Sequence, residues 1–151
     1  MLNKDYKDIL QSFIKNDVKF LVVGAYAMGA YGYPRATGDI DIWVETSEEN
    51  SAHILEALNE FGAPTDGVDT DTFSEKGIVF QIGVPPRRID ILTEIDGVEF
   101  EEAYSQKEDI DLDGLQVSFI SMIDLIKNKE ATGRDKDRLD VKNLKQNGDG
   151  S

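Results

Sequence analysis

The sequence predicts an α+β domain, in which helices and strands follow one another along a chain of 151 residues. Short apolar runs bounded by turn residues, such as residues 20–23, are typical of buried strands. Longer segments place apolar residues at three- and four-residue intervals, which indicates helices. The length suits one hydrophobic core. We therefore expect a single domain over residues 1–146 and a flexible tail over residues 147–151.

The elements can be assigned in order from these patterns and from the turn and capping residues between them. Helices are expected over residues 4–16, 25–31, 46–61, 121–132 and 135–144. Strands are expected over residues 19–23, 39–45, 77–83, 88–92 and 115–119. The third and fourth strands are separated by a Pro-Pro turn and should form a hairpin. Two polar stretches carry no such pattern, and we expect a loop over residues 63–75 and an acidic irregular segment over residues 99–113.

Composition excludes several classes of function. The chain has no cysteine, which rules out disulfides, thiolate zinc sites and cysteine nucleophiles. Its one histidine, His53, lies beside a helical apolar stripe and is expected to have no chemical role. No apolar run approaches the roughly 20 residues of a membrane span, and the N-terminus lacks a signal-peptide pattern, so a cytoplasmic protein is expected.

The charge is strongly acidic but unevenly distributed. A formal net charge of −14 argues against general DNA binding. Residues 94–113 hold nine acids and one lysine, whereas residues 127–145 hold seven basic residues and four acids. The basic segment is either a solvated helix face or a local phosphate site.

The stretch from Gly24 to Val44 carries the main functional pattern. Gly24 directly follows the apolar run of residues 20–23, and a strand–glycine–helix junction exposes backbone N–H groups that can bind an anion. Asp39 and Asp41 lie two residues apart in a strand, so their carboxylates project from the same face. Two adjacent carboxylates repel each other unless a cation lies between them. The pattern predicts a metal and phosphate site.

A third aspartate occupies a later strand. Asp90 lies between two isoleucines, and an acid in an apolar strand is costly to bury unless it is paired or binds a metal. If this strand is a neighbour of the strand that holds Asp39 and Asp41, the three carboxylates converge. Such a set suits one or two Mg²⁺ ions, or Mn²⁺, in phosphoryl or nucleotidyl transfer. Alternatively, the third carboxylate acts as the general base that accepts the proton of the attacking hydroxyl.

These residues resemble the signature of the nucleotidyltransferase superfamily, which includes DNA polymerase β and the aminoglycoside nucleotidyltransferases. Gly24-Ala25, thirteen further residues and then Asp39-Ile40-Asp41 match its pattern of a glycine turn, a helix and two alternating acids. Asp90 matches its third acid. Residues 35–41 and 127–137 are similar to a small prokaryotic branch that holds minimal nucleotidyltransferases and AbiEii-like toxins. The resemblance covers about residues 20–144.

The resemblance implies a mixed, mostly antiparallel sheet flanked by helices, with ATP or GTP bound near the glycine turn. It implies that Asp39, Asp41 and Asp90 form the catalytic metal site, with Mg²⁺ as the cofactor. The implied nucleotide-binding residues are Gly24, Ala25, Arg35, Thr37, Lys129 and Arg134. Ala25 departs from the family pattern, which has Gly or Ser there. A hydroxyl contact to phosphate is therefore missing, while the backbone donor remains.

Simpler interpretations exist for each part of this pattern. Asp39 and Asp41 alone fit a solvated strand end, and Gly24 alone fits a turn that needs glycine for its backbone. Arg35 and Thr37 fit loop residues that bind backbone carbonyls. Lys129, Arg134 and Lys136 fit a solvated helix face with ion pairs to Glu130 and Asp140.

Two functions follow from the sequence. The first is a Mg²⁺-dependent nucleotidyltransferase that moves a nucleoside monophosphate from a nucleoside triphosphate to a hydroxyl of a protein, an RNA or a small molecule. The second is a non-catalytic nucleotide-binding or toxin–antitoxin partner protein that keeps the fold. The short chain also suggests a protein partner or a homo-oligomer that completes the acceptor site.

Overall fold

The structure, a computed structural model, describes residues 2–33 and 38–149, with side chains up to residue 146. Its helices are α1 (Lys4–Lys15), α2 (Gly24–Ala30), α3 (Glu48–Phe61), the 3₁₀ helix η1 (Thr72–Ser74), α4 (Phe100–Ser105), α5 (Met122–Thr132) and α6 (Asp135–Asp149). Its strands are β1 (Phe20–Val23), β2 (Ile40–Val44), β3 (Val79–Ile82), β4 (Ile89–Leu92), β5 (Glu108–Leu112) and β6 (Leu115–Phe119).

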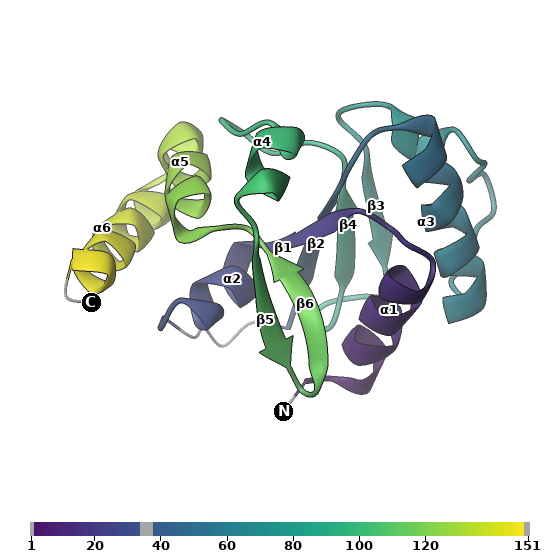
Figure 1. Cartoon of the computed structure of the whole chain (residues 1–151), viewed down its shortest axis with the longest axis horizontal. Coiled ribbons are helices and arrows are strands. Elements are labelled where there is room, and N and C mark those ends of the chain that lie inside the picture. The colour runs from purple at the N-terminus through teal and green to yellow at the C-terminus, as the bar shows by residue number, and fades with distance from the viewer. Residues whose placement is uncertain (1, 34–37, 150–151) are drawn as a thin grey trace.

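The strands form one six-stranded mixed sheet in the order β3-β4-β2-β1-β6-β5. The β1–β2, β3–β4 and β5–β6 pairs are antiparallel, whereas β1–β6 and β2–β4 are parallel. Figure 1 shows α1 and α3 on one side of this sheet and α2, α5 and α6 on the other. The α+β fold with a mixed, mostly antiparallel sheet is confirmed.

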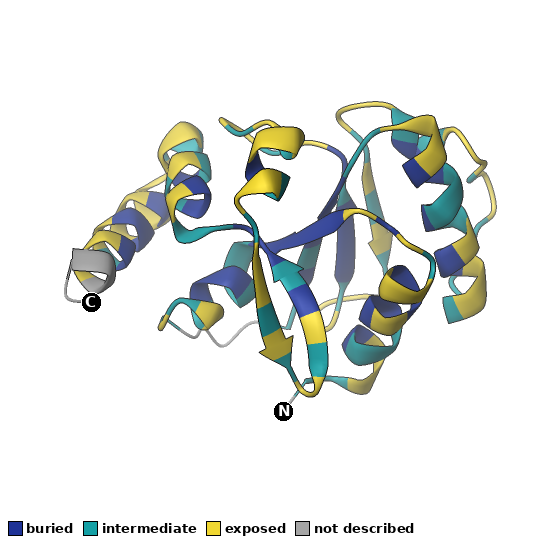
Figure 2. Cartoon of the chain, viewed as in Figure 1, coloured by how far each residue is buried: buried dark blue, intermediate teal, exposed yellow. Residues whose placement is uncertain are grey.

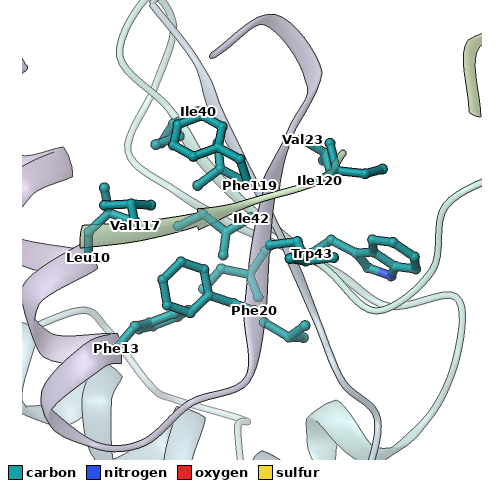
Figure 3. Close-up of a cluster of buried hydrophobic side chains, with 14 of the residues drawn as sticks. Leu10, Phe13, Phe20, Val23, Ile40, Ile42, Trp43, Val117, Phe119 and Ile120 are labelled. Carbon is teal, nitrogen blue, oxygen red and sulfur yellow. The ribbon is translucent and has the colours of Figure 1, made fainter. Parts of the chain in front are cut away.

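The central strands carry the core, and their burial decreases toward the sheet edges. Each residue of β1 is buried, and β4 is buried over three of its four residues, whereas β5 is exposed or half-buried throughout (Figure 2). On β2, Ile40 and Ile42 are fully buried and lie with Phe13 and Phe119 in one apolar cluster (Figure 3). Because strand residues alternate in direction, Asp41 and Trp43 face the opposite side of the sheet.

The helix ends follow the capping residues of the sequence. Ser47 accepts a hydrogen bond from the Asn50 N–H at the start of α3, and Ser121 accepts one from Asp124 at the start of α5. Gly62 and Gly133 end these helices in the left-handed conformation that glycine adopts at low cost. The helix bounds predicted there are confirmed to within two residues.

The acidic segment of residues 99–113 was wrongly predicted to be irregular, since it holds α4 and β5. α4 is fixed by aromatic contacts, because Phe100 packs edge-to-face on Trp43 at 5.0 Å and stacks on Tyr104 at 5.4 Å. β5 is an edge strand whose acidic side chains face solvent. Its acidic composition did not indicate a strand, although an edge strand tolerates charged side chains.

Smaller differences occur at two further places. The loop of residues 63–75 contains η1, whose Phe73 is buried. Helix α6 continues to Asp149, beyond the predicted helix end at residue 144, and the flexible tail expected over residues 147–151 stays a prediction. Among the described residues, no helix combines the length and apolarity that a bilayer crossing requires.

Candidate active site

The β2–β4 ladder places two of the predicted aspartates side by side. The two strands pair in parallel, with Asp41 opposite Asp90 and Ile40 opposite Ile89. Asp39 directly precedes β2, two residues before Asp41, so it is presented from the same face of the sheet. The two strands are neighbours in the sheet, so the condition under which the three aspartates converge is met. We call Asp39, Asp41 and Asp90 the carboxylate cluster.

Arg88 joins two members of the carboxylate cluster. Its Nε donates to Asp90 Oδ1 at 2.7 Å, and its Nη2 donates to Asp90 Oδ2 at 3.2 Å. The same Nη2 forms an ion pair with Asp39 Oδ2 at 3.3 Å. The backbone N–H of Arg88 also donates to Asp39 Oδ1 at 3.1 Å. Arg88 therefore contacts all four carboxylate oxygens of Asp39 and Asp90.

Sequence reasoning missed Arg88, although a signal was present. Arg88 lies two residues before Asp90, and strand residues two apart share a face. An arginine at that spacing in a strand is within reach of the carboxylate that follows it, so the pair could have been proposed from the sequence.

The electrostatics of the carboxylate cluster concentrate on Asp41. Burial, followed by the nearby carboxylates of Asp90 and Asp39, raises the pKa of Asp41 to about 6 against the opposing charge of Arg88. A buried carboxyl group with two further carboxylates beside it is a candidate position for an added cation.

Gly24 brings the start of α2 close to Asp41. Its backbone has a φ of +69°, a left-handed conformation that side chains rarely adopt. A Cβ atom at this position would collide with the carboxylate of Asp41. Gly24 is thus needed both for the turn and for the approach of the two segments. Ala25 follows it in the first turn of α2 and is half-buried.

The comparisons with known proteins agree with this geometry. The family model described as "Nucleotidyl transferase of unknown function (DUF2204)" matches residues 2–149. The chain belongs to this family. No curated protein sequence matches the chain.

Two solved structures are similar to this nucleotidyltransferase. One is a candidate nucleotidyltransferase, TM1012, from Thermotoga maritima, with a TM-score of 0.62 and 15% identity over 97% of this chain and 96% of that one. The other is the lincosamide antibiotic adenylyltransferase LnuA with lincomycin bound, with a TM-score of 0.60 and 15% identity over 96% of this chain and 97% of that one. At this identity the likeness shows a shared fold.

Lys129 and Arg134 of this nucleotidyltransferase bind acids of α6. Lys129 is buried, and its Nζ lies 2.9 Å from Asp140 Oδ2 and 3.7 Å from Asp137 Oδ1. Arg134 Nε donates to Asp137 Oδ2 at 2.6 Å. We call Lys129, Arg134, Asp137 and Asp140 the helix cluster. Figure 1 shows α5 and α6 at one end of the molecule, apart from β2 and β4.

The helix cluster is separate from the carboxylate cluster, and its Lys129 and both acids are buried whereas Arg134 is exposed. Asp137 and Asp140 are 1% and 0% exposed. Burial alone would raise the pKa of Asp137, but hydrogen bonds from Arg134 and Thr132 and the charges of Arg134 and Lys129 lower it to about 2. The contacts thus link α5 to α6. A nucleotide-binding role of Lys129 and Arg134 stays a prediction, and Arg35 and Thr37 lie outside the described residues.

The carboxylate cluster has the donor atoms that a hard cation prefers, but it is not a ready metal cage. Within residues 2–33 and 38–149, no group of three or more acidic or histidine side chains is arranged to hold a metal ion. Asp39 and Asp90 are instead held by Arg88. The donor set still fits Mg²⁺ or Mn²⁺ chemically, because it offers the oxygen atoms of three carboxylates.

A separate cavity of about 930 Å³ lies beyond the carboxylate cluster, past the far end of β2. It is lined by Trp43, Phe100 and several acids, including Glu45 and Glu94, and not by the three aspartates. The carboxylate cluster, at β2 and β4, is the candidate site for the predicted chemistry, and this cavity is separate from it.

Proposed function

We propose that the chain is a Mg²⁺-dependent nucleotidyltransferase that uses the carboxylate cluster. The observation that carries the proposal is the in-register pair of Asp41 and Asp90, joined by Asp39, in a member of a nucleotidyltransferase family. The proposed donor is ATP or GTP, and the proposed acceptor is a hydroxyl group of a protein, an RNA or a small molecule. The similarity to an adenylyltransferase supports ATP as the first donor to test.

In this proposal Asp39, Asp41 and Asp90 hold one or two Mg²⁺ ions, and Mn²⁺ can replace them. The bound metal would stabilise negative charge on the α-phosphate. The acceptor oxygen forms a bond to the α-phosphorus while the bond to the β-phosphate oxygen breaks and pyrophosphate leaves. The hydroxyl proton passes to a carboxylate, for which Asp90 is the proposed general base.

The remaining site residues have proposed roles in binding the nucleotide. The backbone of Gly24 and Ala25 is proposed to approach the β- and γ-phosphates, which is supported by the contact of Gly24 with Asp41. Arg35 and Thr37 are proposed to line the entrance. We also propose a cytoplasmic location and an acceptor site that a partner or a second copy completes.

Label transfer tests the proposal. The protein is incubated with each α-labelled nucleoside triphosphate, Mg²⁺ or Mn²⁺, and a lysate as a source of acceptors. We expect transfer from at least one nucleotide, and a loss of about 10²-fold or more in Asp41→Asn and Asp90→Asn, because charge stabilisation is the main contribution in such reactions. Asp66→Asn, in an exposed loop, is the matched control and should keep full transfer.

Two results would contradict the proposal. One is the absence of transfer from every nucleotide, and the other is transfer that both cluster substitutions leave unchanged. Calorimetry with Mg²⁺-nucleotide then tests the alternative function. A non-catalytic binding protein would retain nucleotide or partner binding without transfer.

A further inference from the structure

Arg88 occupies the position between carboxylates where a cation is expected. Its guanidinium binds both oxygens of Asp90 and one oxygen of Asp39, and its backbone N–H takes the other oxygen of Asp39. The planar guanidinium matches the geometry of a carboxylate and forms strong paired hydrogen bonds with it. Three of the oxygens that a metal ion would use, both of Asp90 and one of Asp39, are therefore already engaged by this side chain.

The fold creates a need for such a cation. Asp41 and Asp90 are held opposite each other by the β2–β4 ladder, and Asp39 precedes them on β2. Like charges at this distance destabilise the folded chain unless a positive group lies among them. Arg88 directly precedes β4, and its side chain is about a quarter exposed. Part of the side chain therefore already reaches solvent while it binds the carboxylates.

We propose that Arg88 is a positioning residue that substitutes for the metal ion between Asp39 and Asp90 in the nucleotide-free protein and withdraws from Asp90 when a metal ion binds. This inference rests on the proposed function, because it concerns the same carboxylates. It also explains why the three aspartates form no ready metal cage in the structure. Their arrangement is fitted to a guanidinium.

Two measurable consequences follow from competition for the same oxygens. Arg88 lowers the affinity of the nucleotide-free protein for a divalent cation, since binding must break the Arg88–Asp90 hydrogen bonds. Arg88 also stabilises the metal-free fold, since its removal breaks the two hydrogen bonds to Asp90 and the ion pair with Asp39. Replacing Arg88 should therefore lower the stability of the metal-free protein and increase the stability that it gains when a metal ion binds.

Manganese binding without nucleotide provides the test. Mn²⁺ alone is titrated into the wild-type chain, Arg88→Gln, Arg88→Lys and Arg87→Gln, with free Mn²⁺ followed by electron paramagnetic resonance. We expect Arg88→Gln to bind Mn²⁺ about tenfold more tightly than wild type, because the lost hydrogen bonds no longer oppose binding. Arg88→Lys keeps the charge but loses the planar fork, and it should lie between the two.

Arg87→Gln is the matched control, because it removes the same charge from the adjacent exposed residue. It should leave Mn²⁺ affinity within about twofold of wild type, as expected for an exposed charge screened by solvent. Thermal unfolding gives a second measurement. Arg88→Gln should unfold at a lower temperature than wild type in EDTA. Addition of Mn²⁺ should raise its unfolding temperature by more than it raises that of wild type.

Each other outcome has a separate meaning. Equal or weaker Mn²⁺ binding by Arg88→Gln overturns the inference and leaves the proposed function standing, because the site still binds metal. An equal gain in Arg87→Gln also overturns it, because net charge then explains the effect. Failure of every variant and of wild type to bind Mn²⁺, with and without nucleotide, overturns the proposed metal site and the inference together. If Arg88→Gln does not fold, Arg88→Lys carries the same comparison.

Discussion

The carboxylate cluster and the helix cluster both gather acids and cations, yet they differ in charge balance. The first holds three carboxylates and the guanidinium of Arg88. The second holds two carboxylates, of Asp137 and Asp140, with the ammonium of Lys129 and the guanidinium of Arg134. Counted over these described side chains alone, the first has more carboxylates than cations, and the second has as many of each.

The pKa shifts follow this difference. At the carboxylate cluster, burial and the other acids raise the pKa of Asp41 to about 6. At the helix cluster, the cations overcome burial and lower the pKa of Asp137 to about 2. A cluster with surplus charge is suited to bind a further cation, whereas a balanced buried cluster holds elements together. Charge balance thus separates a candidate active site from a structural ion-pair network in one small chain.

The largest effect is expected from breaking the helix cluster. Lys129→Met leaves the buried Asp137 and Asp140 with one fewer cation, and removing one partner of a buried ion pair costs about 3–5 kcal/mol of unfolding free energy. Urea denaturation measures this loss. Lys127→Met, at an exposed position of the same helix, should change the unfolding free energy by less than about 0.5 kcal/mol. Equal, small effects of both substitutions would show that the helix cluster has no structural role.

The next effect concerns the approach of Gly24 to Asp41. Gly67→Ala introduces a side chain at a φ of +79° in open space and should cost about 1 kcal/mol of unfolding free energy. Gly24→Ala adds a collision with the Asp41 carboxylate to a similar backbone strain, so we expect at least about twice that loss. Chemical denaturation of both variants gives the comparison. Matching losses would mean that Asp41 moves away freely.

Much of this arrangement could be predicted from the sequence, because local signals determine it. The strand alternation around Asp41 and the caps at Ser47 and Ser121 are local, and the helices and strands assigned from them are found in the structure. The mixed, mostly antiparallel sheet was implied by the family resemblance, and it is confirmed. The register of β2 against β4 could be stated only as a condition, since pairing of distant strands leaves no local trace.

The ion pairs of the helix cluster could not be predicted from the sequence. The basic segment of residues 127–145 fits a phosphate site or a solvated face equally well. Its actual partners depend on how α5 and α6 pack, which buries Lys129 between two acids. The same limit applied to α4, because its aromatic contacts with Trp43 come from tertiary packing.

A pH effect should distinguish the two clusters. The pKa of Asp41 is raised in the folded state, from 3.8 to about 6, so the folded state binds more protons than the unfolded state between these values. The stability of metal-free wild type therefore falls as pH rises from 4 to 6 relative to Asp41→Asn, which lacks this group. Above pH 6 the charged Asp41 destabilises the metal-free fold, and Asp41→Asn should be the more stable protein.

Thermal unfolding in EDTA from pH 4 to 8 measures this difference. Asp137→Asn provides the opposite case, because the pKa of Asp137 is lowered to about 2 and its charged form stabilises the fold. This contribution to stability is complete above pH 4. Its difference from wild type should stay constant over the same range. Curves for Asp41→Asn that run parallel to wild type would contradict the surplus of charge at the carboxylate cluster.

The smallest effect is expected at Arg134. Its side chain is 70% exposed, so Arg134→Ala should reduce the unfolding free energy by only about 1 kcal/mol. If Arg134 also binds the nucleotide, Arg134→Ala weakens Mg²⁺-nucleotide affinity while Arg138→Ala, an equally exposed control, does not. Calorimetry decides this, and equal affinity in both variants would remove Arg134 from the nucleotide site.

A nuclear magnetic resonance titration with Mn²⁺ gives the most direct test of the contrast. The account requires the carboxylate cluster to bind the cation and the helix cluster not to bind it. Bound Mn²⁺ broadens the amide signals of nearby residues. We predict that substoichiometric Mn²⁺ broadens the signals of Gly24, Asp41 and Asp90 and leaves those of Lys129 and Asp140 sharp. Broadening centred on the helix cluster, or no localised broadening, would contradict the assignment of the carboxylate cluster as the metal site.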